Sequence, residues 1–213
     1  MSPKIYVTDS VLPCPRGAAA RRLMGMKLTF DMKIAMLFGN AIHSYLKKKA
    51  RGHAEFPVRA DINGVTVSGR IDVLGRNVTE LKVISPSHMQ WIVKNGPEEH
   101  HLLQALFYRE ILHTDKPVSL VYLTMPEKGL PREREIIDTP YGTATMHARG
   151  PVTIFTMESP KSVKNLLVER ARELINALND LNSARIVPSW QCASCPLQDK
   201  CPALREVGPF VII

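Results

Sequence analysis

Long apolar segments are lacking in this chain of 213 residues. No run of about 20 apolar residues occurs, so the sequence predicts no helix that spans a membrane. Its first ten residues, MSPKIYVTDS, show no basic stretch followed by an apolar one, so we expect no secretory signal peptide. Internal repeats and low-complexity tracts are lacking as well. These absences predict a soluble, cytoplasmic protein.

Acidic residues are in deficit, since 20 Asp and Glu stand against 28 Lys and Arg, which leaves a formal net charge of +8. A basic balance favours a polyanionic partner such as nucleic acid, although charge alone does not name the partner. The hydrophobic content of 45% suffices for a core in a chain of this length. We therefore expect a single domain over residues 1–213.

Cysteines are few, and three of the four lie close together near the end of the chain, as Cys192-x-x-Cys195 and Cys201. In a reducing compartment this spacing indicates a metal site rather than disulfides. Zinc and iron–sulfur clusters both accept four thiolates, and the spacing does not choose between them. Because Cys14 is the only other cysteine, a four-thiolate site must join the two ends of the chain.

The segment from Val67 to Ser85 alternates apolar and polar residues on both sides of a turn, which predicts a half-buried β-hairpin. A loop at 75–77, with Asn77 in the left-handed conformation, places Leu74 opposite Val78 and Asp72 opposite Glu80. Two carboxylates opposed at about 5 Å repel each other. A bound divalent cation such as Mg²⁺ would reverse that interaction. A solvated charged face, with Lys82 screening Glu80, explains the same residues without a metal.

A strand over 55–62, followed by the Asn63-Gly64 turn, is expected to pair with the start of this hairpin. With Ile62 opposite Val65, the register places Phe56 opposite Ile71 and Glu55 opposite Asp72. The apolar residues of all three strands then share one face. Glu55 either lies beside the two carboxylates or simply ends an edge strand.

Helices are predicted on both sides of the hairpin in the sequence. Over 31–49 the apolar residues recur at helical spacing, and His43 points away from their stripe, with Gly39 one turn earlier. A second helix from Pro97 to about Leu112 places Gln104 and Tyr108 on one face. Further strands are expected over 118–124, 132–138 and 152–157, and a final helix over 160–182.

The order of these motifs carries a resemblance. Asp72, followed after seven residues by Glu80-x-Lys82, resembles the core of the PD-(D/E)XK nucleases. Gln104-x-x-x-Tyr108 resembles the QxxxY motif of their RecB-type branch. With these motifs, His43 and the four cysteines, the sequence resembles the CRISPR-associated RecB-like exonuclease family. The resemblance extends from Cys14 to Cys201 and is weakest over 115–157.

The resemblance implies an α/β (α+β) fold with a restriction-endonuclease-like core, in which helices flank a central mixed sheet. Residues 31–183 would form this nuclease core. A cysteine-cluster cap would join an N-terminal segment, 1–30, to a C-terminal segment, 184–213.

It also implies a function and a site. The activity would be phosphodiester hydrolysis by a DNA exonuclease, 5′ to 3′ from single-stranded ends, in CRISPR spacer acquisition alongside integrase proteins. Lys82 would position the attacking water or neutralise charge, and Gln104 and Tyr108 would orient the DNA backbone or the lysine. Mg²⁺ or Mn²⁺ would be held by His43, Asp72, Glu80 and the backbone carbonyl of Leu81, and a two-iron or four-iron cluster by Cys14, Cys192, Cys195 and Cys201.

Two other functions account for parts of the same pattern. A DNA-binding module with a catalytically idle site would use the basic charge and the cysteines alone. A structural subunit of a DNA-processing complex would use the cysteines as a zinc staple. Metal analysis and a nuclease assay separate the three.

Overall fold

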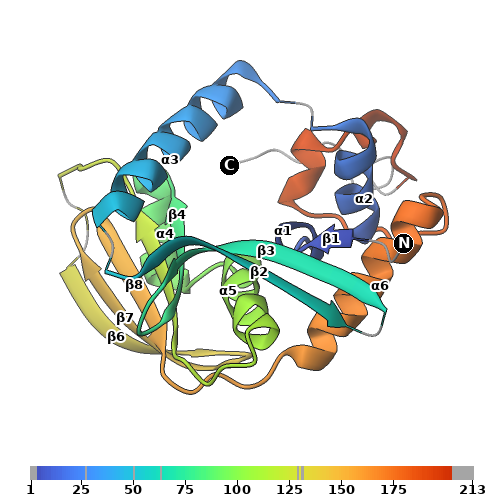
Figure 1. Ribbon diagram of the computed structural model, residues 1–213. Helices are drawn as coiled ribbons and strands as arrows, with labels where there is room; N and C mark the ends of the chain where they lie inside the picture. Colours follow the sequence, from blue (N-terminus) through green and yellow to red (C-terminus); the bar gives the residue numbers. More distant parts are fainter. Residues whose placement is uncertain are drawn as a thin grey trace.

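A mixed sheet of eight strands forms the centre of the protein, in the order β1-β3-β4-β5-β8-β7-β6, with β2 paired to β3 outside this path (Figure 1). The computed structural model describes residues 4–26, 28–49, 51–62, 64–128, 130 and 132–202. The strands are β1 (Lys4–Tyr6), β2 (His53–Ile62), β3 (Val65–Leu74), β4 (Val78–Val83), β5 (Val118–Leu123), β6 (Arg132–Thr139), β7 (Gly142–Arg149) and β8 (Val152–Met157).

Helices lie on both sides of this sheet, and α5 packs against β4 and β5 (Figure 1). β1 runs parallel to β3 and β4 parallel to β5, whereas the other pairings are antiparallel. This mixed sheet flanked by helices confirms the predicted fold class. The α-helices are α1 (Val7–Ser10), α2 (Pro15–Met24), α3 (Phe30–Lys49), α4 (Pro86–Asn95), α5 (Glu99–Ile111) and α6 (Lys164–Asn179), and two short 3₁₀ helices follow, η1 (Trp190–Ser194) and η2 (Gln198–Lys200).

The three-stranded unit β2–β3–β4 has the predicted register. Ile62 pairs with Val65 and Phe56 with Ile71, which confirms the two-residue turn, although its Asn63 lies outside the described residues. Leu74 pairs with Val78, as expected. The shared apolar face is largely buried, as shown by Val58, Val65, Val67, Ile71, Val73 and Leu81.

One edge of β3 is shared between two strands. β1 pairs with residues 66–68, and β4 pairs only with Val73 and Leu74. Between these two stretches, residues 69–72 have no strand partner on that edge in the described part of the chain. The backbone pairing of β3 with β4 therefore stops before it reaches Asp72 and Glu80. This opening is where the predicted site residues gather.

Two local predictions on these strands need correction. Asn77 does not adopt the left-handed conformation; its side-chain amide instead donates a hydrogen bond to Ser119 Oγ (2.7 Å). Glu55 has that conformation, with φ of 54°, and forms an ion pair with Arg70 at 3.1 Å. Glu55 thus lies near Asp72 in the strand register without a strand pairing to it.

Several elements were not predicted from the sequence, namely β1, α1, α2, α4 and β7. The final helix is shorter than expected, and Pro97 precedes α5 rather than beginning it. Among the described helices, none is both long enough and apolar enough to cross a membrane.

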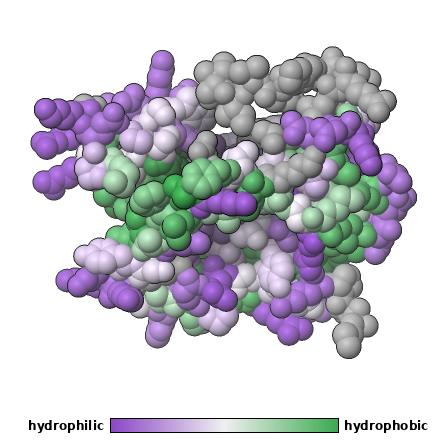
Figure 2. All heavy atoms as spheres, turned by 90° about the horizontal axis from the view of Figure 1, so that it is seen from above, coloured by the Kyte–Doolittle hydropathy of each residue, from purple (hydrophilic) through white to green (hydrophobic). Residues whose placement is uncertain are grey.

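The helix α3 matches its predicted range, but its apolar stripe is largely exposed. Phe30, Leu37, Phe38 and Tyr45 are more than half exposed. Figure 2 looks onto the side of the molecule where α3 lies in Figure 1, and it shows apolar areas among hydrophilic side chains. Apart from the backbone of its own helix, no described atom lies within 4 Å of the position a Cβ on Gly39 would take. No other described element therefore approaches α3 closely at Gly39.

Candidate active site

A cleft of about 640 Å³ opens beside the unpaired stretch of β3. His43 of α3 and Asp72 of β3 line it together with Glu80 of β4, and basic side chains lie along its walls. Figure 1 shows the three elements that supply these residues, with α3 on the opposite side of β3 from α5. The lining includes His43, Asp72, Glu80, Gln104 and Tyr108 of the predicted site, as well as Glu55, Lys4, Tyr6, Arg59 and Arg70.

Asp72 replaces part of the interrupted backbone pairing. Its Oδ2 accepts a hydrogen bond from the backbone N–H of Leu81 at 2.9 Å, and its Oδ1 lies 3.4 Å from His43 Nδ1. The residue is only 8% exposed. A short strand overlap therefore frees the Leu81 N–H for a carboxylate and fixes where this carboxylate points.

Glu80 is a buried carboxylate with one unsatisfied oxygen. The residue is 3% exposed, and Lys82 Nζ donates a hydrogen bond to its Oε1 at 2.8 Å. Its Oε2 is buried and has no hydrogen-bond partner among the described residues. Burial raises the pKa of Glu80 to about 7, against the lowering effect of Lys82, and the nearby Asp72 raises it further. The cleft thus holds two buried carboxylates, and one oxygen of Glu80 accepts no hydrogen bond from the described residues.

Lys82 links Glu80 to helix α5 through a chain of hydrogen bonds. Its Nζ also donates to Gln104 Oε1 at 2.9 Å, and Gln104 Nε2 donates to the Tyr108 hydroxyl at 3.3 Å. Burial raises the pKa of Tyr108 to about 12, so this hydroxyl remains protonated at neutral pH. The spacing of Gln104 and Tyr108 on one helix face lets both side chains reach the same network.

Tyr108 packs directly over the β3 backbone at Gly69. A Cβ at position 69 would overlap the Tyr108 ring and lie 3.1 Å from its hydroxyl oxygen. Only glycine leaves room for the ring at this point of the strand. Gly69 was not singled out in the sequence, because the contact joins residues that are far apart in the chain.

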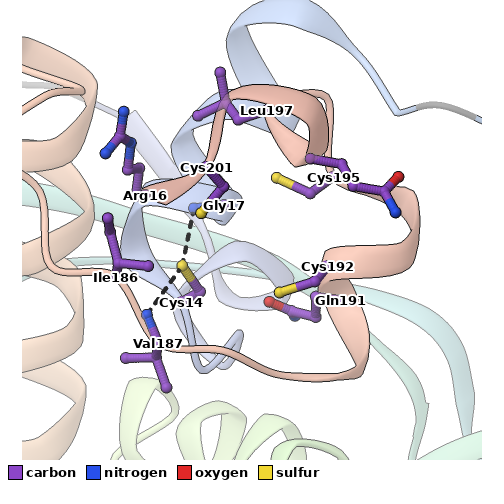
Figure 3. A pocket seen from close by; sticks show the side chains of 11 residues that line it. Cys14, Arg16, Gly17, Ile186, Val187, Gln191, Cys192, Cys195, Leu197 and Cys201 are labelled. Carbon is purple, nitrogen blue, oxygen red and sulfur yellow. Dashed lines mark hydrogen bonds between the residues drawn. The ribbon is translucent and has the colours of Figure 1, made fainter. Parts of the chain in front are cut away.

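The four cysteines line a separate cavity of about 20 Å³, far smaller than the cleft. Their side chains surround the same space, with Cys14 and Cys201 on one side of it and Cys192 and Cys195 on the other (Figure 3). Cys14 is the N-cap of α2 and accepts hydrogen bonds from the backbone N–H groups of Gly17 (3.3 Å) and Val187 (3.5 Å). The structure therefore brings together the two distant parts of the sequence that contain cysteine.

Backbone N–H groups around the cysteine cavity point at sulfur, and Gly17 lies at ordinary contact distance from two cysteines. Ser189 N–H donates to Cys192 Sγ at 3.4 Å, and a Cβ on Gly17 would lie 3.5 Å from Cys14 Sγ and 3.9 Å from Cys195 Sγ. Arg21, which the sequence analysis missed, joins α2 to the same segment by donating to Gln191 O and Ser194 Oγ, both at 2.8 Å. Burial raises the pKa of the Cys195 thiol.

A further group, Glu98, His100 and His101, gathers at the start of α5. The sequence analysis missed it, although three histidines and two glutamates within residues 88–101 were a visible signal. Among the predicted residues of the Asp72–Glu80 cleft, Lys82 reaches the cleft through its hydrogen bonds to Glu80 and Gln104, and Glu55 lies at the cleft wall. The catalytic and ligand roles of the predicted site residues stay predictions.

Comparisons with known proteins agree with this architecture. The sequence pattern of the PD-(D/E)XK nuclease superfamily matches residues 44–202, well over half of the chain. A solved structure described as "Crystal structure of SSO0001" resembles the protein with a TM-score of 0.62 and 22% sequence identity, over 95% of this chain and 88% of that one. At this identity the likeness concerns the fold alone, and no curated protein shows a significant match. The chain belongs to the PD-(D/E)XK nuclease superfamily.

Proposed function

We propose that this protein is a divalent-metal-dependent DNA exonuclease that hydrolyses phosphodiester bonds in the cleft at Asp72 and Glu80. Membership of the superfamily implies a metal-dependent nuclease. The observation that carries the assignment is the unpartnered, buried Glu80 Oε2 beside a second buried carboxylate. A divalent cation satisfies such an oxygen and compensates the charge of the pair.

The proposed ligands are the side chains of His43, Asp72 and Glu80 and the backbone carbonyl of Leu81. Because the Leu81 N–H points to Asp72, and the N–H and C=O of one strand residue point to the same side, the carbonyl also faces this site. When bound, Mg²⁺ or Mn²⁺ lowers the pKa of a bound water and stabilises negative charge on the phosphate. Oxygen ligands and one imidazole suit either ion.

Lys82 is proposed to neutralise charge that develops on the phosphate. Its ammonium group is held between Glu80 Oε1 and Gln104 Oε1, so its position is fixed before substrate binds. Tyr108 supports Gln104 from one turn further along α5. Gln104 and Tyr108 therefore position the lysine, and neither needs to transfer a proton.

The walls of the cleft suit a single strand of DNA. Lys4, Arg59 and Arg70 supply positive charge for the phosphates. Tyr6 is 43% exposed, and the cationic groups of Lys4 and Arg22 lie 5.2 and 5.1 Å from the centroid of its ring. An exposed aromatic side chain among basic groups is a combination found in grooves that bind single strands. These features support single-stranded DNA as substrate, and we propose attack on its ends, 5′ to 3′, on the motif resemblance alone.

We further propose that the cysteines hold an iron–sulfur cluster. In the described chain, the only three potential ligand atoms within 4.8 Å of one another belong to Glu98, His100 and His101, so the sulfurs are more widely spread than that. A single zinc with Zn–S bonds of about 2.3 Å would draw its thiolates to about 3.8 Å. The wider arrangement suits a polynuclear cluster, whereas the N–H groups directed at sulfur would stabilise thiolates on either metal. A role in CRISPR spacer acquisition beside integrase proteins remains a proposal from the motif resemblance.

Cleavage of end-labelled DNA tests the proposed function. With Mn²⁺, we expect a single-stranded oligonucleotide labelled at its 5′ end to release labelled short products from the start of the reaction. The same oligonucleotide labelled at its 3′ end should shorten progressively. A closed circular single strand is the control and should persist. Rapid cleavage of the circle would contradict the exonuclease assignment, and an absence of cleavage of any DNA would contradict the nuclease assignment.

Substitution of Gly69 tests the positioning role of α5. Gly69→Ala places a methyl group where the Tyr108 ring lies, so Tyr108 must shift and release Gln104 and Lys82. We expect roughly a 10- to 100-fold loss of cleavage rate, because displacements of about 1 Å in positioning groups cost about 10²-fold. Mn²⁺ binding should be retained, since no proposed metal ligand is changed.

Gly39→Ala is the matched control, because no described atom outside the backbone of its own helix lies within 4 Å of the added methyl group. We expect this variant to cleave DNA at about the rate of the unmodified protein. An unchanged rate in Gly69→Ala, measured with the fold intact by circular dichroism, would contradict the role of Tyr108 as a positioning residue.

A further inference from the structure

One glutamate and three histidines meet where α4 is followed by α5. Glu98 Oε2 lies 3.0 Å from His101 Nδ1 and 3.9 Å from His100 Nε2, while Glu98 Oε1 lies 3.4 Å from His88 Nε2. Among the described residues, Glu98, His100 and His101 are the only three whose ligand atoms all lie within 4.8 Å of one another. None of them lines the Asp72–Glu80 cleft.

The spacing of Glu98, His100 and His101 suits a tetrahedral metal site. Zinc bonds of about 2.0–2.1 Å to nitrogen and oxygen place neighbouring ligand atoms about 3.4 Å apart. The distances from Glu98 Oε2 to His101 Nδ1 and His100 Nε2 lie on either side of that value. His88 approaches the other carboxylate oxygen, Oε1, and lies outside the group within 4.8 Å, so it must move further to join the same ion.

The protonation states of the cluster suit a cation. Burial lowers the pKa values of His100 and His101. Both imidazoles are thus neutral at pH 7, which is the form that binds metal. The hydrogen bond between His101 and Glu98 lowers the pKa of Glu98, although burial opposes it. An ionised carboxylate therefore faces neutral imidazoles.

Neighbouring groups hold the donor atoms in place. The Tyr122 hydroxyl of β5 accepts a hydrogen bond from the Glu98 backbone N–H and lies 3.1 Å from His101 Nδ1. The rings of His100 and His101 are 4.0 Å apart, centroid to centroid. The side chain of His88 is 36% exposed, so the group remains open to solvent on one side.

We propose that Glu98, His100 and His101 bind one Zn²⁺ ion, with His88 as the fourth ligand. Imidazole nitrogens with one carboxylate form a donor set that zinc accepts, in contrast to the oxygen-rich set at Asp72 and Glu80. The ion fastens α4 to the start of α5, one turn before Gln104. This second metal site braces the helix that positions Lys82, and it does not depend on the nuclease assignment.

Zinc stoichiometry tests the proposal. The full-length protein, with any metal at its cysteines left in place, is titrated with Zn²⁺ and its bound zinc is counted after gel filtration. We expect His100→Ala/His101→Ala to bind one equivalent fewer than the unmodified protein. Asp72→Asn/Glu80→Gln should retain that equivalent. His147→Ala, which removes an exposed histidine from β7, is the matched control and should also retain it.

Thermal melting supplies a second readout. At 100-fold over its dissociation constant, Zn²⁺ should raise Tm by roughly 5–10 °C in the unmodified protein and in Asp72→Asn/Glu80→Gln. It should give no such rise in His100→Ala/His101→Ala. Equal zinc content and equal shifts in that variant would overturn the proposal.

If His100→Ala/His101→Ala does not fold, zinc-edge X-ray absorption of the unmodified protein tests whether imidazole groups bind the ion. Imidazole scattering with nitrogen and oxygen neighbours at about 2.0–2.1 Å is the expected spectrum. A zinc-loaded protein without imidazole scattering would equally overturn the site. A result against the zinc site would not affect the cleavage proposal, because the cleavage proposal rests on other residues and is tested by another assay.

Discussion

Glu80→Ala is expected to abolish DNA cleavage. The change removes the buried carboxylate whose Oε2 has no partner in the described chain and deprives Lys82 Nζ of one acceptor. Metal coordination supplies several kcal/mol of transition-state stabilisation, and each loss of about 1.36 kcal/mol slows a reaction tenfold. We therefore expect the rate to fall by about 10³-fold or more in a Mn²⁺-supported assay.

DNA binding should survive this substitution, because affinity for a polyanion depends mainly on basic groups spread along the surface. Glu133→Gln is the control, since it alters an exposed glutamate on β6, remote in sequence from the proposed site. It should cleave at the unmodified rate. If Glu80→Ala cleaved DNA as fast as this control, the proposed role of the carboxylate pair would be wrong.

Cys14→Ala is expected to remove the metal from the cysteine cavity and destabilise the whole chain. Cys14 lies at the N-terminus of α2, whereas the other three cysteines belong to the segment after α6. A cluster on all four therefore closes most of the chain into a loop and links metal binding to folding. The unmodified protein should be brown and contain two or four irons per chain. The variant should be colourless, with Tm lower by about 10 °C or more, because each 1 kcal/mol corresponds to about 2–4 °C.

Cys192→Ala separates metal loss from loss of packing. Cys14 is buried, whereas Cys192 is only partly buried, so equal effects of the two variants indicate a shared metal. A colourless unmodified protein with one zinc per chain would refute the iron proposal. It would still agree with a metal that joins the two ends of the chain. Full metal content and unchanged Tm in Cys14→Ala would show that the ends of the chain are not joined by a metal.

Local patterns predicted the central strands well. The alternation of apolar residues and the turn before Val65 determine the register of β2 and β3 from neighbouring residues alone. The helix α4 was missed because the hairpin segment was taken to end at Ser85 and no element was predicted between it and Pro97. In the structure Ser85 caps this helix and Pro86 occupies its first turn. The strand β7 was missed although Ala144, Met146 and Ala148 alternate inward, because small residues give a weak strand signal.

The candidate site was predicted as a set of residues but not as a geometry. Motif spacing identified Asp72, Glu80 and Lys82, yet it gave no sign that the strand pairing stops before the carboxylates. The contact of Tyr108 with Gly69 and the group around Glu98 join separate elements. Such contacts are set by the packing of helices on the sheet, which no local pattern encodes.

The metal dependence of cleavage tests the central claim most directly. The unmodified protein is treated with a chelator to remove divalent cations, and its rate on single-stranded DNA is measured before and after Mn²⁺ or Mg²⁺ is added. We predict no cleavage after chelation, full recovery with added ion, and no recovery in Glu80→Ala under the same conditions. Cleavage that persists without divalent ions, or recovery that is equal in Glu80→Ala, would contradict a metal site at Asp72 and Glu80.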